Sequence, residues 1–248
     1  MKLSGNLAGN LGAPEALSPL DQLGAQVRNR WKVWAAADSN ITIVSSRIHV
    51  ITDVGSVPSD MTQSVAAERP NHTDSGGPND KPYLSLTGNA YSLPTTADIG
   101  LASGHRSGVF CVFAGNAANR SWLQATDDDP AAFIPLELRR LSGGEFGANS
   151  SFVDAAQNLT ITTPAYDTDW HYSSSLSLST GNLHKIDGVE VDPQWTDDSG
   201  WKRVHTISFG THLGNTSSGY ACEILIVSDV DAAAEALIAQ YMSEEYGL

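Results

Sequence analysis

The sequence has few basic residues, few cysteines and no long hydrophobic run. Its 248 residues include 14 Lys and Arg but 28 Asp and Glu, which gives a formal net charge of −14. A protein that binds nucleic acid needs a basic surface to displace the counterions of the phosphates, and anionic lipid headgroups also attract basic segments. The negative net charge therefore argues against nucleic acid and against an anionic membrane surface as partners.

Hydrophobic residues are spread along the chain and are not collected in one segment. No stretch approaches the roughly 20 apolar residues that span a bilayer. Residues 3–12 lack the continuous apolar core of a secretion signal. We therefore expect no membrane insertion and synthesis in a cytoplasm.

The two cysteines, Cys111 and Cys222, cannot form a disulfide scaffold or a tetrahedral zinc site. Both lie in apolar runs, at residues 108–114 and 221–227. A free cysteine in such a run behaves as a small hydrophobic residue. We predict two buried, reduced thiols, and one disulfide between them is the alternative.

Short runs of alternating polar and apolar residues dominate the chain. In residues 173–179, Leu176 and Leu178 fall on one side and serines on the other, which predicts a half-buried strand. Residues 156–163 and 204–209 show the same alternation. Many short strands of this kind indicate an antiparallel sandwich or barrel.

The pair Asp187-Gly188 gives the strongest turn signal in the chain. It separates two short apolar runs, and both central residues of a type I′ hairpin turn adopt positive φ, which Asp and Gly tolerate. We therefore predict a two-residue β-hairpin at this point.

One convincing helix is predicted, at the C-terminus. Ser228 and Asp231 have the spacing of a capping box, and Gly247 stands where the helix would end. Helical spacing gives this segment an apolar face that would pack on the sandwich, made of Ala234, Leu237, Ile238 and Tyr241.

Residues 1–34 differ in composition from residues 35–248, which we expect to form one domain. The first segment is rich in Gly and Asn and leads into a short helical pattern. Because a helix of that length is not stable alone, it must dock on another surface. It is either a tail lying along its own domain or an arm that inserts into a neighbouring subunit, and its anchoring residues would be Leu3, Leu7, Leu11, Leu20, Leu23 and Val27.

Residues 34–248 contain a series of short motifs, each present once. They are Trp34–Asp38, Ile41–Ile43, Asp53, Thr62-Gln63, Glu68–Pro70, Pro82–Gly88, Val109–Phe113, Asp169–His171, Ile186–Glu190, Ile207–Gly210, Ala221–Ile226 and Ile238–Leu248. In this order they resemble the concanavalin A-like lectin and laminin-G-like jelly rolls, in the version found in bacteriophage and bacterial surface proteins. The resemblance implies an all-β antiparallel sandwich with a closing C-terminal α-helix and an extended N-terminal arm.

Fold alone does not give a function, and the chain lacks a convincing catalytic set. A retaining glycoside hydrolase needs two carboxyl groups about 5 Å apart, which hydrolases of the resembling family place as Glu-x-Asp-x-x-Glu on one strand. Here Glu190 and Asp192 are followed by Trp195 in place of the second Glu. Ser75 lies in a sequence like that around a trypsin-like nucleophile, but no matching His motif precedes it, which favours a polar loop. We therefore expect no enzyme activity.

Metal binding is left open by two acidic clusters. Proteins of the resembling family often hold calcium in loops, and residues 127–129 and 197–198 supply the carboxylates that a hard cation prefers. Neither cluster has the spacing of a defined coordination shell, so solvated acidic loops are the favoured interpretation. We expect no cofactor, with calcium as the alternative.

Carbohydrate binding requires an exposed aromatic platform beside directional hydrogen-bonding groups. Aromatic and acidic residues meet this description in predicted loops, and the candidates are Trp122, Trp195, Asp197, Asp198, Trp201 and Tyr220. Trp170 is set apart, because the Trp-His step of the resembling family belongs to a packed strand. A place in the core or in a subunit contact is the alternative for each of these aromatics, since interfaces are also rich in them.

Taken together, these features suggest a structural protein on the surface of a phage or phage-like virion, either a head decoration or a head spike. Its arm would bind capsid or tail proteins of the same particle, and the domain would form a homo-oligomer and touch cell-surface glycans weakly. A tail fibre or receptor-binding protein that recognises host carbohydrate is the alternative. An excess of acidic surface would keep many displayed copies soluble.

Overall fold

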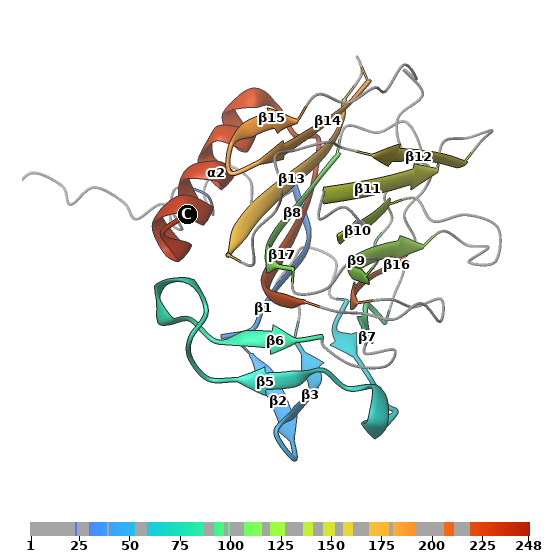
Figure 1. The fold of residues 1–248 in the computed structure, drawn as a ribbon, viewed down its shortest axis with the longest axis vertical. Helices are drawn as coiled ribbons and strands as arrows, with labels where there is room; N and C mark the ends of the chain where they lie inside the picture. The colour runs from blue at the N-terminus through green and yellow to red at the C-terminus, as the bar shows by residue number, and fades with distance from the viewer. Residues whose placement is uncertain are drawn as a thin grey trace, which may run out of the picture.

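The computed structural model describes residues 23, 30–38, 40–52, 59–86, 92–96, 99, 107–115, 120–126, 136–140, 146–151, 156–160, 169–178, 181–191, 206–210 and 219–248. Within them, two antiparallel sheets lie face to face and one long helix covers the outer face of the larger sheet (Figure 1). This arrangement confirms the predicted all-β sandwich with a C-terminal helix. No helix among these residues is long and apolar enough to cross a membrane.

The larger sheet has eleven strands among the described residues, in the order β15-β14-β13-β8-β17-β6-β5-β3-β2, with β1 also paired to β17 and β4 to β3. Its strands are β1 (Trp31–Ala36), β2 (Ile41–Val44), β3 (Arg47–Ile51), β4 (Met61–Thr62), β5 (Asn71–Thr73), β6 (Tyr83–Ser85), β8 (Ser107–Ala114), β13 (His171–Leu178), β14 (Gly181–Ile186), β15 (Val189–Val191) and β17 (Tyr220–Ser228). Two short 3-10 helices, η2 (Ala66–Glu68) and η3 (Pro78–Asp80), interrupt the connections around β5.

The smaller sheet has six strands among the described residues, in the order β12-β11-β10-β9-β16-β7. Its strands are β7 (Ser92–Pro94), β9 (Arg120–Thr126), β10 (Leu136–Arg140), β11 (Phe146–Ser151), β12 (Ala156–Thr160) and β16 (Thr206–Gly210). Strands β12 and β16 confirm the alternating segments predicted at residues 156–163 and 204–209, within the parts of those segments that the structure describes.

The space between the two sheets is filled by one apolar core. Alternate residues of β8 and β17 point into it and meet β9 and β16 of the smaller sheet, as the period of two along a strand requires. The members that meet in this layer include Val109, Cys111, Phe113, Leu123, Ile207, Phe209, Ile224 and Ile226, all fully buried.

The opposite face of β8 and β17 is covered by helix α2 (Ala232–Tyr246). The intervening residues Phe110 and Val112 of β8 and Leu225 of β17 pack there against Ile238 and Met242 of the helix. The predicted apolar helix face is therefore confirmed. Because both faces are covered, β8 is buried along its whole length, which explains its continuous apolar run.

The helix begins three residues later than the capping box predicts. Its N-cap is Asp231, whose side chain accepts a 2.7 Å hydrogen bond from the backbone N–H of Ala234. Ser228 instead ends β17, and its hydroxyl donates to the carbonyl of Arg30. The predicted end at Gly247 is confirmed, since this residue closes the helix with a φ of 69°.

The hairpin prediction at Asp187-Gly188 is confirmed. These residues join β14 to β15 with φ values of 49° and 77°, as a type I′ turn needs. The strand predicted at residues 173–179 is also present as β13, but its serines are not solvated: Ser173, Ser174 and Ser175 are buried. Both faces of this strand are covered, one by the core between the sheets and the other by the packing around α2.

Most of the predicted arm lies outside the described residues, namely Leu3, Leu7, Leu11, Leu20 and Val27. Leu23 is described and is fully buried in the apolar cluster beneath α2. Strand β1 begins at Trp31 and pairs with β17, so residues just before position 35 belong to the large sheet.

We expect Ile238→Ala to lower the free energy of unfolding by about 2–5 kcal/mol, because it leaves a cavity between α2 and the sheet. Gln240→Ala, on the exposed side of the same helix, is the matched control and should change it by less than about 0.5 kcal/mol. Urea unfolding of both variants measures the difference. Equal stabilities would show that α2 is not docked as described.

Candidate functional site

Three aromatic side chains, Tyr83, Trp170 and Tyr220, form a half-buried cluster at one rim of the large sheet. The ring centroids of Tyr83 lie 5.3 Å from Tyr220 and 5.5 Å from Trp170, both in edge-to-face contact. Trp170 and Tyr220 are 6.1 Å apart. Edge-to-face pairs at these distances are favourable, so the three rings support one another and keep partly exposed surface.

Strand pairing brings these rings together from distant parts of the sequence. Tyr220 is opposite Ala114 at the end of β8, and His171, which follows Trp170, is opposite the neighbouring Phe113. On the other side of β17, Tyr220 pairs with Ser85, two residues after Tyr83. The order β13-β8-β17-β6 thus sets the cluster.

Gly219 allows β17 to enter the sheet beside this cluster. Its φ is +125°, and an added Cβ atom would lie 2.7 Å from the carbonyl oxygen of Ala114. An L side chain rarely adopts this backbone conformation, and the clash is with backbone, which cannot rotate away. Glycine is therefore required for Tyr220 to reach its place.

Two histidines are close to this cluster along the strands but point to the opposite face of the large sheet, because each is paired with a residue of the inter-sheet core. Nδ1 of His171 lies 2.7 Å from Oδ2 of Asp187, whose Oδ1 accepts a hydrogen bond from the backbone N–H of Tyr172. On the β5 side, Nδ1 of His72 lies 3.1 Å from Oδ1 of the exposed Asp74. Nε2 of His72 lies 3.1 Å from the carbonyl oxygen of the residue preceding Asp38.

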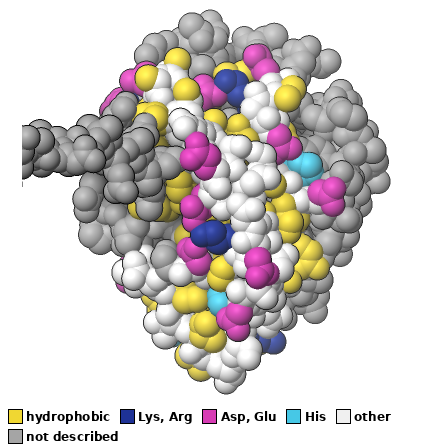
Figure 2. All heavy atoms as spheres, turned by 90° about the vertical axis from the view of Figure 1, so that its left-hand side faces the viewer, with side chains coloured by type: hydrophobic (Ala, Val, Ile, Leu, Met, Phe, Trp, Pro, Cys, Tyr) yellow, Lys and Arg dark blue, Asp and Glu magenta, His cyan; other side chains and the backbone are white. Residues whose placement is uncertain are grey.

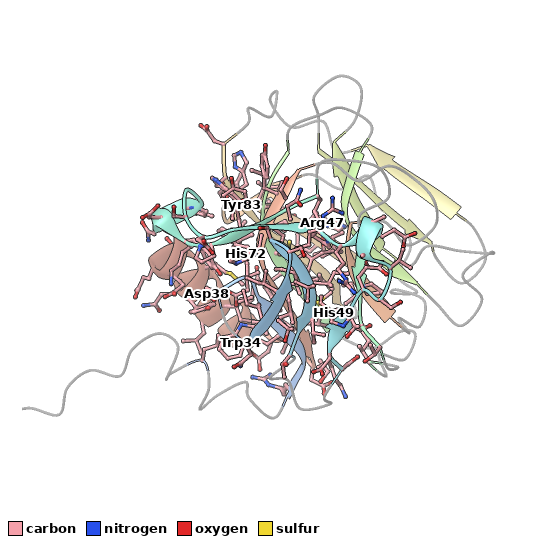
Figure 3. The ribbon with its side chains drawn as sticks, turned by 90° about the horizontal axis from the view of Figure 1, so that it is seen from below. Trp34, Asp38, Arg47, His49, His72 and Tyr83 are labelled. Atoms are coloured by element: carbon pink, nitrogen blue, oxygen red, sulfur yellow. The ribbon has the colours of Figure 1, made fainter. Side chains whose placement is uncertain are left out.

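Figure 3 shows Tyr83, His72 and Asp38 following one another on the underside of the molecule. The register of β5 and β6 puts Thr73 opposite Tyr83 and His72 opposite Leu84, so the His72 ring points to the inter-sheet face and Tyr83 to the face that α2 covers. Asp38 in turn lies 3.5 Å from Nζ of Lys81. The rim therefore has aromatic surface beside the carboxylate of Asp38 and the ammonium group of Lys81, which can hydrogen-bond a polar ligand, whereas the His72 side chain is only 6% exposed.

The polar motifs around residues 62–70 have a structural role. Nε of Arg69 donates to the carbonyl oxygen of Gln63, from which Nδ1 of His49 is 2.9 Å away. Arg47 donates to the carbonyl oxygens of Ala66 and Ala67 in η2. These side chains satisfy backbone acceptors in a segment with little regular pairing, and Figure 3 shows Arg47 and His49 to one side of His72 and Tyr83.

Only part of the predicted carbohydrate site lies in the described residues. Tyr220 is in the aromatic cluster, whereas Trp122 belongs to β9 of the other sheet, where its backbone alone is described. The remaining candidates, Trp195, Asp197, Asp198 and Trp201, lie outside the described residues, as do the acidic residues 127–129.

Tyr83 and Trp170 were not among the predicted ligand residues. Both pack against the apolar cluster beneath α2 and also contact Tyr220. Trp170 is therefore packed on one side, as expected, but it is also part of the aromatic cluster. No periodicity links them to Tyr220, because they come from three separate segments. The family motifs at residues 82–88 and 169–171 were the signal that could have singled them out.

A second group of polar residues is buried between the large sheet and α2. Glu223 of β17 is completely buried and accepts hydrogen bonds from Nε1 of Trp34 at 2.5 Å, the hydroxyl of Tyr241 at 3.0 Å and the hydroxyl of Tyr246 at 2.5 Å. Burial raises the pKa of Glu223 to about 7, although these hydrogen bonds favour the charged form. Glu223 is 0% exposed, so a polymer at the surface cannot contact its carboxyl group.

The other buried titratable groups are held in uncharged forms. Cys111 and Cys222 are both free and buried, as predicted, and desolvation raises the pKa of each thiol. Burial lowers the pKa of His184 to about 3, and its Nδ1 lies 2.8 Å from the hydroxyl of Ser175. Neutral thiols and a neutral imidazole fit a structural role for all three.

The exposed carboxylates do not assemble into a metal site within the described part of the chain. No group of three or more His, Cys, Asp or Glu there is placed to hold an ion. Glu190 is exposed on β15 beside the hairpin, and Ser75 is exposed in the loop after β5, as expected of solvated positions.

Comparisons with known proteins support the sandwich fold. No protein-family model matches the sequence, and no curated protein matches it. Among solved structures, the binding domain of Paraclostridial Mosquitocidal Protein 1 is 9% identical with a TM-score of 0.61 over 88% of this chain and 53% of that chain. The botulinum neurotoxin serotype D binding domain is 11% identical, with a TM-score of 0.57 over 89% and 53%. Trypanosoma rangeli sialidase is 10% identical, with a TM-score of 0.57 over 86% and 33%.

These structures are binding domains and a glycosidase, and all contain sandwich domains like the one described for this chain. The chain spans about half the length of the two toxin binding domains it matches, and a third of the sialidase. At such low identity the likeness shows the β-sandwich fold alone.

We expect Gly219→Ala to lower the free energy of unfolding by about 2 kcal/mol or more, because it combines backbone strain with the clash at Ala114. Gly76→Ala is a matched control: its φ is also positive, but an added Cβ would meet only Cε1 of Tyr83 at 3.9 Å. Its effect should be close to 1 kcal/mol. Chemical unfolding of both proteins tests this, and equal losses would contradict the role of the clash.

Proposed function

We propose that this chain is a non-enzymatic binding protein on the surface of a phage or phage-like particle, and that its sandwich domain binds cell-surface carbohydrate. The observation that carries the carbohydrate part is the half-buried cluster of Tyr83, Trp170 and Tyr220 with polar groups on its flanks. Aromatic faces pack against the C–H groups of a sugar ring, and nearby polar side chains hydrogen-bond its hydroxyls.

A non-enzymatic role fits the placement of the carboxyl groups. Glycoside hydrolysis needs an acid and a second carboxylate that both reach the substrate. Glu223, with the raised pKa that a general acid would need, is sealed beneath α2 and bonded to Tyr241 and Tyr246. The proposed binding also needs no cofactor, and calcium bound by the acidic residues 127–129 or 197–198 is the alternative.

The particle context rests on the charge and the N-terminal segment. A net charge of −14 keeps many displayed copies soluble and discourages particles from adhering to one another. Residues 1–22, the part of the predicted arm before the buried Leu23, supply an anchoring segment for capsid or tail proteins, and several copies on one particle would raise the avidity of weak glycan contacts. We favour a head decoration or head spike, and the alternative is a tail fibre whose main task is receptor recognition.

We expect Trp170→Ala and Tyr83→Ala to weaken binding to a glycan-array ligand about tenfold each. A ring contact is worth about 0.5–1.5 kcal/mol beyond its buried area, and 1.4 kcal/mol is a factor of ten. Tyr220→Phe is the matched control, because it keeps the ring and should retain most of the affinity. Thermal melts of each variant separate a loss of the site from a loss of the fold.

Two results on the array would contradict the proposal. Wild-type protein that binds no glycan would remove the carbohydrate function. Binding that is unchanged in both alanine variants would place the ligand elsewhere on the protein. Release of reducing sugar from a host polysaccharide would contradict the non-enzymatic role.

We expect deletion of residues 1–22 to reduce incorporation into particles while leaving the domain folded. The deletion ends before Leu23 because that side chain is buried in the cluster beneath α2. Occupancy is measured by quantitative gel analysis of purified particles, and urea unfolding of the isolated protein is the control. Wild-type occupancy by the shortened chain would contradict anchoring by this segment.

A further inference from the structure

Helix α2 is fastened to the large sheet through the buried carboxyl group of Glu223, whose hydrogen-bond partners among the described residues are all uncharged. Three side chains from two elements converge on Glu223 of β17: Trp34 of β1, and Tyr241 and Tyr246 of α2. The two tyrosines lie on the C-terminal half of the helix. If this half of the helix separated from the sheet, the Glu223 carboxyl that the docked helix shields would be exposed to water.

The charged and titratable groups around Glu223 give its negative charge little support. Asp38, which follows β1, raises the pKa of Glu223 further, and a charge on Glu223 raises the pKa of the Cys111 thiol, which lies on the other face of the sheet. Cys222 precedes Glu223 on β17, and Glu245 of α2 acts on the neighbouring Tyr241. The nearby cation, Lys81, is paired with Asp38 and Glu245 at the surface.

The hydrogen-bond donors to Glu223 remain protonated across the ordinary pH range. Desolvation and the charge of Glu223 raise the pKa of both Tyr241 and Tyr246, so each hydroxyl continues to donate. The Trp34 indole N–H has no other protonation state. Any change of charge in this group at moderate pH is therefore a change at Glu223.

We propose that Glu223 is a proton-coupled latch for helix α2. The helix docks most firmly when the carboxyl carries a proton, and its C-terminal half loosens when the carboxyl becomes an anion. Figure 2 shows the side of the molecule where the helix lies, with acidic side chains spread over its described surface. Repulsion from these groups acts in the same direction at high pH.

The direction of the pH dependence follows from the two states of the carboxyl. When docked, Glu223 has a pKa near 7, whereas a released side chain returns toward 4.5. The docked form binds the proton more tightly, so the extra docking stability is fully present below 4.5 and is lost as pH rises to 7 and beyond. Protonation also lets the carboxyl donate a hydrogen bond of its own.

Loosening of the helix would reach the aromatic rim. Trp170 and Tyr83 pack against the same apolar cluster that α2 covers, together with Phe110 and Leu225 of the sheet. A helix that separates from this cluster removes part of the support beneath both rings. The latch therefore couples the pH of the surroundings to the aromatic surface, independently of which ligand that surface binds.

Hydrogen exchange of the full-length protein tests the latch. We expect protection of peptides from α2, corrected for intrinsic exchange rates, to fall roughly thirtyfold between pH 5.5 and 8.5, as the two pKa values imply. Peptides from β8 should keep their protection, because they lie in the centre of the sheet. Equal loss in β8 would indicate global unfolding and would overturn the proposal.

Variants separate the role of the proton from ordinary packing. In E223Q the side chain is neutral at every pH, so α2 should be as protected at pH 8.5 as at pH 5.5 and better protected than wild type at pH 8.5. Glu244→Gln makes the same chemical change on the exposed side of α2 and should leave the wild-type profile unchanged. A wild-type profile in E223Q would overturn the proposal.

Tyr246→Phe provides a second test that does not remove the carboxyl. It deletes a hydroxyl that favours the charged form of Glu223 and keeps the buried ring. The pH at which α2 loses protection should therefore shift upward, a result that a purely structural hydrogen bond would not give. A shift to lower pH, or none, would contradict the latch.

Discussion

The structure depends on the burial of the paired strands β8 and β17 on both faces. One face meets the smaller sheet and the other meets α2, so neither strand offers polar side chains to solvent along most of its length. Removal of either cover would expose a broad apolar surface. The helix is thus an integral layer of the domain, and the buried carboxyl beneath it, Glu223, is the group through which we propose that this layer responds to protons.

The aromatic rim follows from the same constraint. Tyr83, Trp170 and Tyr220 lie where β6, β13 and β17 enter the covered region, so each ring has one side packed and another partly exposed. This half-buried state fixes the orientation of the rings before any ligand arrives. Few side chains then have to be ordered on binding, so little conformational entropy is lost and a small number of contacts can give affinity.

Local sequence patterns predicted the elements but not the environment on each face. The Asp187-Gly188 turn, the buried free thiol of Cys111 and the apolar face of α2 depend on neighbouring residues and were predicted correctly. The buried serines of β13 were not, because their cover comes from segments far away in the chain. In the sequence, nothing distinguishes Glu223 from other carboxylates in strands, or Tyr246 from other residues near the end of a helix. The two side chains meet only after α2 folds back onto β17.

The central functional claim is that glycan binds at the aromatic rim. The most direct test is an NMR titration of the tryptophan indole N–H signals with oligosaccharides prepared from a host surface polysaccharide. The account predicts saturable shifts of the Trp170 signal, whereas the Trp34 signal, held by Glu223 beneath the helix, stays unchanged. Saturable binding that leaves Trp170 unaffected would contradict the account.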